Sequence, residues 1–318
     1  MMELIIQIII LIVGFVLLIK GADIFVDGAS NVAYNFKIPT IIVGLTIVAF
    51  GTSAPEAAVS ITSSLAGSNA ISLGNIVGSN IFNILGVIGV SALVGTLTVD
   101  KVLIRRDFPF LVVSTVGLLL IAYFFGEISR LCGIIFLIII ITYVYNLVRK
   151  AREDKEAMSE EIEVKLSIPK AALYIVVGII GIIIGSDFVV DGSSYIASVL
   201  GMSDALIGLT IVAIGTSLPE LVTSVTALKK GDNGIVVGNV LGSNIFNIFF
   251  ILGISGAIFP MAIAPEMVFD ILIMTLVTII GALFTYTKSE VSKTEGLVLV
   301  ALYVLYTGFI IARNYGMI

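Results

Sequence analysis

Two carboxylates in apolar surroundings are the residues of this sequence best suited to bind a cation. Glu56 closes the hexapeptide GTSAPE and Glu220 closes GTSLPE, and each lies in a hydrophobic stretch long enough to cross a bilayer. A carboxylate at the centre of a membrane costs roughly 2.5–3.5 kcal/mol on insertion scales, which argues against a purely structural role. A divalent cation between the two side chains would neutralise both, whereas without a cation one of them would take up a proton.

The proline before each glutamate is expected to break the helix that carries it. Pro55 and Pro219 have no N–H, and each ring clashes with the carbonyl four residues earlier. We therefore expect kinks at Ala49–Thr52 and Ala213–Thr216, whose freed carbonyls must be buried in protein or face a wet cavity. Four hydroxyls beside these carbonyls add oxygens of the kind that hard cations prefer, those of Thr52, Ser53, Thr216 and Ser217.

A second polar motif follows each hexapeptide, GNIVGSNIFN at 74–83 and GNVLGSNIFN at 238–247. Ser79 and Asn83 are four residues apart and share one helix face, and Ser243 and Asn247 repeat the arrangement. We expect these four side chains to line the same site as the glutamates. The other asparagines of the motif are expected to hydrogen-bond between helices as polar glue, namely Asn75, Asn80, Asn239 and Asn244.

The composition indicates an integral membrane protein and excludes several kinds of site. Of the 318 residues, 58% are hydrophobic and 12% are charged, whereas a soluble domain has about 25% charged residues. With no histidine and one cysteine, Cys132, the chain cannot form a Cys/His zinc site, a histidine-based triad or an internal disulfide. We therefore expect a lipid bilayer as its environment, no enzymatic activity and no nucleic-acid partner.

Hydropathy predicts an all-α fold of ten transmembrane helices. A polar segment at 149–168 divides five helices in 1–148 from five in 169–318, and we expect it to be a solvated linker. The ten expected segments are roughly 4–20 with an extension to about 34, 40–66, 71–97, 108–125, 131–149, 169–198, 204–228, 234–259, 266–286 and 295–313.

Basic residues predict the orientation. If the N-terminus lies outside the cell, all 17 Lys and Arg residues except Lys20, Arg130 and Arg313 fall on the cytoplasmic side. The positive-inside rule therefore favours a multi-pass protein of the cell membrane with both termini outside and the central loop in the cytoplasm.

The two halves form an internal repeat that must be inverted. GLTIVAFGTSAPE at 44–56 returns as GLTIVAIGTSLPE at 208–220. For each of the two polar motifs, the second copy lies 164 residues after the first. Because the copies are five helices apart, the second copy crosses the membrane in the opposite sense. Inverted repeats of this kind are typical of secondary transporters, whose pseudo-two-fold axis should bring Glu56 and Glu220 together.

The paired motifs GTSAPE/GNIVGSNIFN and GTSLPE/GNVLGSNIFN resemble those of the cation/calcium exchanger superfamily, most closely prokaryotic sodium/calcium exchangers. The resemblance implies that helices 2, 3, 7 and 8 hold the ion sites, and that the long helices 1 and 6 slide across them. It implies a calcium site at Glu56 and Glu220 with the carbonyls of Thr52 and Thr216. It also implies two sodium sites that share these glutamates. One would use the Ala49 carbonyl with Ser53 and Ser79. The other would use the Ala213 carbonyl with Ser217 and Ser243. Asn83 and Asn247 would lie in the middle.

The resemblance also narrows the expected function. Its potassium-dependent branch has Asp where this chain has Asn247, which argues against potassium co-transport. We expect a sodium/calcium antiporter that works by alternating access, with Na⁺ and Ca²⁺ as substrates, no other cofactor and a monomeric functional unit. A proton/calcium antiporter remains an alternative because both glutamates could carry protons, and a cation channel is a further alternative.

Overall fold

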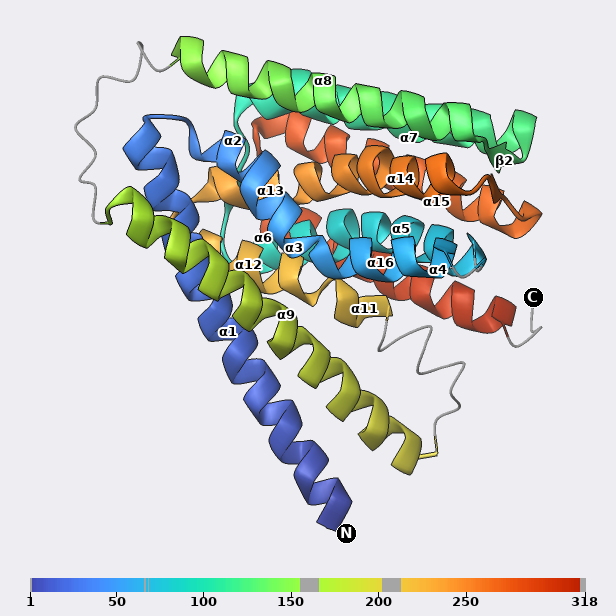
Figure 1. Ribbon diagram of the computed structural model, residues 1–318, viewed down its shortest axis with the longest axis horizontal. Coiled ribbons are helices and arrows are strands. Elements are labelled where there is room, and N and C mark those ends of the chain that lie inside the picture. The colour runs from blue at the N-terminus through green and yellow to red at the C-terminus, as the bar shows by residue number, and fades with distance from the viewer. Residues whose placement is uncertain (1, 66, 68, 155–165, 202–212, 315–318) are drawn as a thin grey trace.

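The computed structural model describes residues 2–65, 67, 69–154, 166–201 and 213–314, and it is built almost entirely of helices (Figure 1). Within these residues, eight helices are long and apolar enough to span a membrane, and a bent pair at 40–65 makes a ninth. The predicted all-α membrane fold is therefore confirmed. The expected span 204–228 falls partly on residues 202–212, outside the described residues, so the count of ten remains a prediction.

Helices α1 (Met2–Phe36) and α9 (Ile168–Val199) form a long pair that projects from the rest of the molecule (Figure 1). They pack closely because glycines lie where they cross: a Cβ on Gly21 would be 2.7 Å from the backbone nitrogen of Ile182. The expected extension of the first helix is confirmed, since α1 continues to Phe36.

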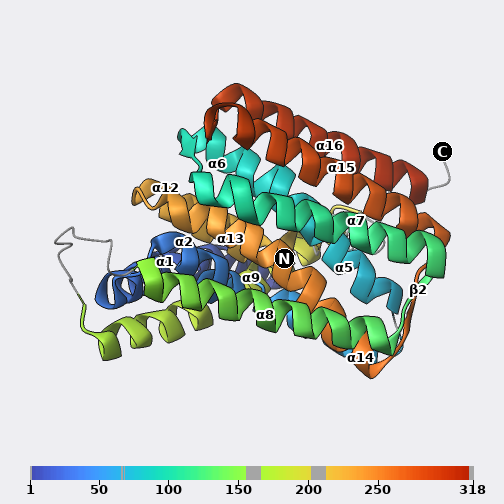
Figure 2. The ribbon, with the colours of Figure 1, turned by 90° about the horizontal axis from the view of Figure 1, so that it is seen from above.

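Two spans form the centre of the remaining bundle. The stretches Ile71–Val94 and Asn233–Ile258 are 83% and 89% buried, whereas the other six spans are 11–39% buried. Figure 2 shows α13 (Asn233–Phe246) between α8 (Arg130–Asp154) and α7 (Phe108–Phe125). The central spans therefore face protein, and the outer helices present apolar side chains to lipid.

The remaining elements complete the two central spans and the helices around them. The first copy contributes α2 (Thr40–Val43), η1 (Gly44–Val48), α3 (Ala49–Thr52), α4 (Ala54–Leu65), α5 (Asn69–Phe82), η2 (Asn83–Ile88), α6 (Gly89–Val94) and η3 (Leu103–Asp107). The second copy contributes α11 (Ala213–Thr216), α12 (Leu218–Lys229), η5 (Asn247–Ile251), α14 (Leu252–Ile258), α15 (Pro265–Lys288) and α16 (Lys293–Asn314). The η segments are π-helical turns. The expected linker begins later than predicted, because α8 continues past 148 to Asp154.

Two short sheets join the halves in a reciprocal way. β1 (Leu97–Thr98) pairs antiparallel with β4 (Glu290–Val291), and β2 (Glu127–Ile128) pairs antiparallel with β3 (Met261–Ala262). β1 and β3 are equivalent in the two copies, as are β2 and β4, so one pairing is the image of the other. Helix packing repeats this relationship. α6 of the first copy packs on α16 of the second, and α14, the equivalent of α6, packs on α8, the equivalent of α16, as expected for an inverted repeat.

The helix breaks lie one residue later than predicted. α3 continues through Thr52, and the break falls at Ser53 (φ −82°, ψ 9°), where the helix axis bends by 48°. In the second copy the break falls at Ser217 (φ −98°, ψ 6°), between α11 and α12. The shift has a simple cause: a break at the serine leaves the proline in the first turn of the next helix, where a missing N–H costs nothing.

Candidate ion-binding site

The two glutamates are held across the pseudo-two-fold axis by serines of the opposite copy. The hydroxyl of Ser53 donates to Glu220 Oε1 at 2.8 Å, and the hydroxyl of Ser217 donates to Glu56 Oε1 at 3.0 Å. All four side chains have no solvent-exposed surface. The helix breaks place these serines, since Ser53 and Ser217 are the residues at which the two helices bend.

Serines of the second motif reach the same carboxylate oxygens. Ser79 donates to Glu56 Oε1 at 3.5 Å, and Ser243 donates to Glu220 Oε1 at 3.3 Å. The hydroxyl oxygens of Ser217 and Ser79 also lie 2.9 Å apart, within hydrogen-bond distance. The sequence therefore predicted correctly that both motifs meet at one place.

The grouping of the serines differs from the one that the resemblance implied. Ser79 lies with Ser217 on Glu56, while Ser53 and Ser243 both lie on Glu220. The expected grouping placed the serines of each copy together. The hydrogen bonds instead bring together serines of different copies, because the inverted halves interlock and the broken helix of one copy lies against the second motif of the other. The sodium sites themselves stay a prediction. Close packing shows the same relationship: a Cβ on Gly242 would be 2.7 Å from the carbonyl oxygen of Leu45.

Four buried oxygens in this region have no hydrogen-bond partner among the described residues. They are the second carboxylate oxygens of Glu56 and Glu220, and the amide oxygens of Asn83 and Asn247. Buried polar atoms are almost always hydrogen-bonded, so unpartnered ones need an explanation. Carboxylate and amide oxygens are ligands for hard cations such as Ca²⁺, which takes six to eight of them at about 2.3–2.6 Å.

The central asparagines begin irregular turns that the sequence did not predict. Asn83 is the first residue of η2 and Asn247 is the first residue of η5, so the same π-helical turn recurs in both copies. Such turns are rare within α-helices and occur often at functional sites. The motif carried no recognisable signal for them.

The two threonines use their hydroxyls to join the copies. Thr52 donates to Asn239 Oδ1 at 3.0 Å, and Thr216 donates to Asn75 Oδ1 at 3.4 Å. Asn75 in turn donates to the carbonyl of Glu56 at 3.3 Å, and Asn239 donates to the carbonyl of Glu220 at 3.4 Å. The prediction that these two asparagines join helices is confirmed.

The expected carbonyl ligands lie at the ends of the short helices that precede each break. The carbonyl of Ala49 accepts the backbone N–H of Ser53 at 3.0 Å. Ala213 is the first residue of α11, and its side chain is outside the described residues.

Other charged groups are paired away from this site. Lys230 lies 2.7 Å from Asp23 Oδ1 and 2.7 Å from Asp27 Oδ1, and it joins the C-terminal end of α12 to α1. Within the described residues, no group of three or more His, Cys, Asp or Glu side chains is arranged to hold a metal. An ion at the candidate site would therefore meet two carboxylates and otherwise neutral oxygens.

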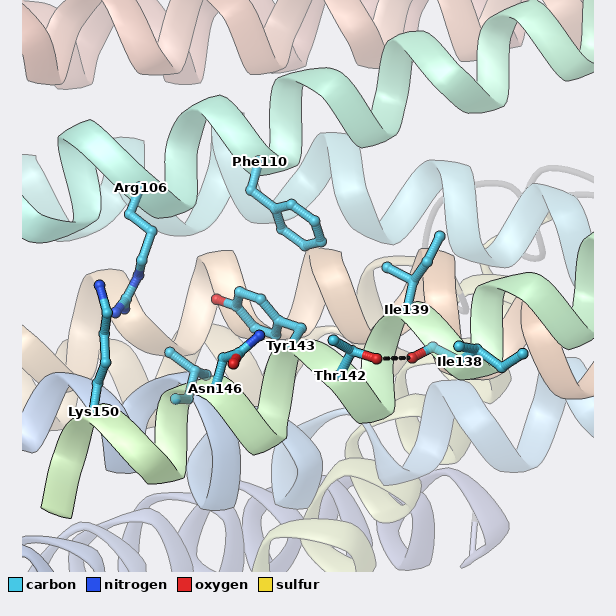
Figure 3. A pocket seen from close by; sticks show the side chains of 9 residues that line it. Arg106, Phe110, Ile138, Ile139, Thr142, Tyr143, Asn146 and Lys150 are labelled. Atoms are coloured by element: carbon cyan, nitrogen blue, oxygen red, sulfur yellow. Dashed lines mark hydrogen bonds between the residues drawn. The ribbon is translucent and has the colours of Figure 1, made fainter.

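A separate groove of about 520 Å³ lies between α7 and α8. Figure 3 shows Arg106 and Lys150 at one end and Ile138 and Ile139 at the other. Its lining is mainly apolar and shares no residue with the polar cluster, so the groove is a poor site for a cation. No motif of the sequence pointed to this groove.

Comparison with known proteins agrees with this architecture. The family model described as sodium/calcium exchanger protein matches residues 6–149 and 170–312. The putative antiporter CaxA of Alkalimonas amylolytica is 38% identical over 92% of this chain and 95% of its own length. The sodium/calcium exchanger MaX1 of Methanosarcina acetivorans is 34% identical over 93% and 96%. A solved structure of the sodium-calcium exchanger NCX_Mj, soaked with 2.5 mM Na⁺ and 0.1 mM Ca²⁺, is similar with a TM-score of 0.82 and 31% identity, over 95% of this chain and 97% of that one.

Proposed function

Since the chain belongs to the sodium/calcium exchanger family, we propose that it is a secondary antiporter that exchanges Na⁺ for Ca²⁺ by alternating access. The observation that carries the proposal is the set of four buried oxygens without partners among the described residues, on Glu56, Glu220, Asn83 and Asn247. Two of them belong to carboxylates, whose charge a divalent cation would cancel.

The proposed calcium site lies between Glu56 and Glu220. Their unpartnered oxygens would bind the ion together with the backbone carbonyls of Thr52 and Thr216, which flank the two helix breaks. Asn83 and Asn247 would supply neutral oxygens at the centre. Oxygen ligands with two negative charges suit Ca²⁺ better than a softer metal.

The proposed sodium sites flank the calcium site and share its glutamates. Following the observed hydrogen bonds, one would use Glu56 with Ser79 and Ser217, and the other would use Glu220 with Ser53 and Ser243. The carbonyls of Ala49 and Ala213 would complete them.

Shared ligands explain how the two fluxes would be coupled. Na⁺ and Ca²⁺ would compete for the same carboxylate oxygens, so binding of one would displace the other. Two ionised glutamates without a cation are costly at the membrane centre, which disfavours a change of access by the empty carrier. Exchange is therefore favoured over leak.

We also propose that the protein works as a monomer in the cell membrane, with both termini outside and the central loop in the cytoplasm. The inverted repeat places both halves of the site in one chain, so no second copy is needed to complete it. The distribution of basic residues supports this orientation.

Flux measurements in proteoliposomes test the proposal. We expect Ca²⁺ uptake when vesicles loaded with Na⁺ are diluted into Na⁺-free buffer, with no effect of K⁺ and no uptake driven by a proton gradient alone. Uptake driven by protons would make it a proton/calcium antiporter, and Ca²⁺ flux that needs no counter-ion would make it a channel. Vesicles carrying the double variant Glu56→Gln/Glu220→Gln provide the matched control.

A further inference from the structure

Asn80 and Asn244 form a reciprocal pair at the centre of the molecule. The side-chain nitrogen of Asn244 donates to the backbone carbonyl of Asn80 at 3.2 Å, and that of Asn80 donates to the carbonyl of Asn244 at 3.5 Å. Asn80 is 1% exposed and Asn244 is fully buried, so these contacts hold the two second motifs against each other in the interior of the protein.

The amide oxygens of this pair accept hydrogen bonds from the central asparagines in a crossed pattern. Asn247 donates to Asn80 Oδ1 at 3.0 Å, and Asn83 donates to Asn244 Oδ1 at 3.0 Å. Each central asparagine is therefore held by the opposite copy, although an asparagine of its own copy lies three residues away in the sequence.

This pattern determines which end of each central amide is available to a ligand. An asparagine side chain has an oxygen that accepts and a nitrogen that only donates. Because the amide oxygens of Asn80 and Asn244 can only accept, they require the nitrogen of the central amide on their side. The oxygens of Asn83 and Asn247 are then left without a partner among the described residues. A reversed amide would present N–H groups, which repel a cation.

We propose that Asn80 and Asn244 are positioning residues of the ion site: each fixes the amide of the central asparagine in the opposite repeat, so that its oxygen is available to the transported cation. This inference rests on the proposed function, because it requires Asn83 and Asn247 to bind the ion. The sequence motif alone indicated only that Asn80 and Asn244 join helices as polar glue.

Crossed double-mutant cycles test the proposal, since interaction energies appear only between residues that act together. The variants are Asn80→Ala, Asn247→Ala and their double, with Asn80→Ala/Asn83→Ala as the mismatched control. The readout is the apparent KM for Ca²⁺ and the maximal rate of exchange in proteoliposomes, with thermal stability in detergent measured for each variant.

We expect Asn80→Ala to raise the KM for Ca²⁺ about tenfold, the lower end of the effect of losing a residue that orients a metal ligand. In the Asn247→Ala background the same change should have no further effect, whereas in the Asn83→Ala background the two effects should multiply. The mirror set with Asn244→Ala should couple to Asn83 and not to Asn247, and it stands in for the first set if Asn80→Ala does not fold.

A rescue experiment separates positioning from general support of the fold. In Asn247→Asp both side-chain oxygens are acceptors, so an oxygen faces the ion in either orientation. We therefore expect Asn80→Ala to leave the KM of Asn247→Asp unchanged or to lower it. If Asn80→Ala raised the KM for Ca²⁺ by the same factor in the Asn247→Ala, Asn83→Ala and Asn247→Asp backgrounds, the positioning role would be overturned and the proposed function would remain intact. An unchanged KM in Asn247→Ala and Asn83→Ala would instead remove the central asparagines from the ion site, and the proposal with them.

Discussion

Ser53 donates a hydrogen bond of 2.8 Å to Glu220, a residue of the other repeat, and the equivalent bond from Ser217 to Glu56 measures 3.0 Å. The shorter of the two serine hydrogen bonds to each carboxylate thus comes from the half of the protein to which the carboxylate does not belong. Neither repeat could assemble the candidate site by itself, which gives the inverted duplication a direct structural purpose.

Replacing either glutamate with glutamine should abolish Ca²⁺ exchange. The side-chain amide of Glu56→Gln or Glu220→Gln keeps an oxygen that can accept the serine hydroxyl, so the fold should be retained. The negative charge that a divalent ion needs is lost. Initial Ca²⁺ uptake driven by a Na⁺ gradient should fall to the level of empty liposomes, with normal elution on size exclusion. Wild-type rates in either variant would remove that carboxylate from the mechanism.

Ser217→Ala should impair exchange more than Ser53→Ala. Ser217 donates to Glu56 and lies 2.9 Å from the hydroxyl of Ser79, whose own distance to Glu56 is 3.5 Å. Ser53 donates to Glu220, which has a closer second serine in Ser243, at 3.3 Å. A hydrogen bond to a charged group contributes about 1.5–3 kcal/mol. We therefore expect an increase of roughly tenfold or more in the KM for Na⁺ with Ser217→Ala, where tenfold corresponds to about 1.4 kcal/mol. Equal KM values in the two variants would contradict this ranking.

Much of the candidate site could be predicted from the sequence because its chemistry is local. Glu56 and Glu220 could be identified because a charge in an apolar span is costly. Pro55 and Pro219 could be identified because proline interrupts a helix. The repeat then predicted which residues meet at the axis. The break itself was misplaced by one residue, because the sequence did not show that the proline would begin a new helix.

Contacts between the copies could not be predicted in the same way. The bond between Ser217 and Ser79 and the crossed bonds of Asn80 and Asn244 depend on how far the two halves interlock. The π-helical turns at Asn83 and Asn247 likewise have no counterpart in hydropathy or residue spacing. Sequence patterns predicted which residues to look for in the candidate site, while tertiary packing determined their hydrogen-bond partners.

Tyr143→Phe should destabilise the protein more than Lys230→Ala does. Asp107 is fully buried and accepts hydrogen bonds from Tyr143 at 2.8 Å and from Arg106 at 2.9 Å. Removing the tyrosine hydroxyl weakens the support of a buried charge and should cost about 1.5–3 kcal/mol. The ion pairs of Lys230 are partly exposed and should contribute less than about 1 kcal/mol.

Thermal unfolding in detergent checks this ranking of stabilities. The variant Tyr143→Phe should show the lower apparent Tm, and Lys230→Ala should stay close to the wild type. Neither residue belongs to the candidate ion site, so the KM for Ca²⁺ should remain unchanged in both. A lower Tm for Lys230→Ala than for Tyr143→Phe would show that the contact between α1 and the end of α12 contributes more to stability than its exposure indicates.

Asn247→Asp should change the ion preference of the exchanger. The substitution has nearly the same shape but adds a third negative charge to the proposed ion site, which favours a divalent ion over Na⁺ and leaves charge for a further cation. We expect the KM for Ca²⁺ to fall, and the exchange rate to become sensitive to K⁺, which we expect to have no effect on the wild type. Exchange measured with Na⁺, K⁺ and Ca²⁺ varied independently tests both effects, with Asn239→Asp as a control at an asparagine that contacts Thr52 and the Glu220 backbone. An unchanged ion profile would place Asn247 outside the path of the ion.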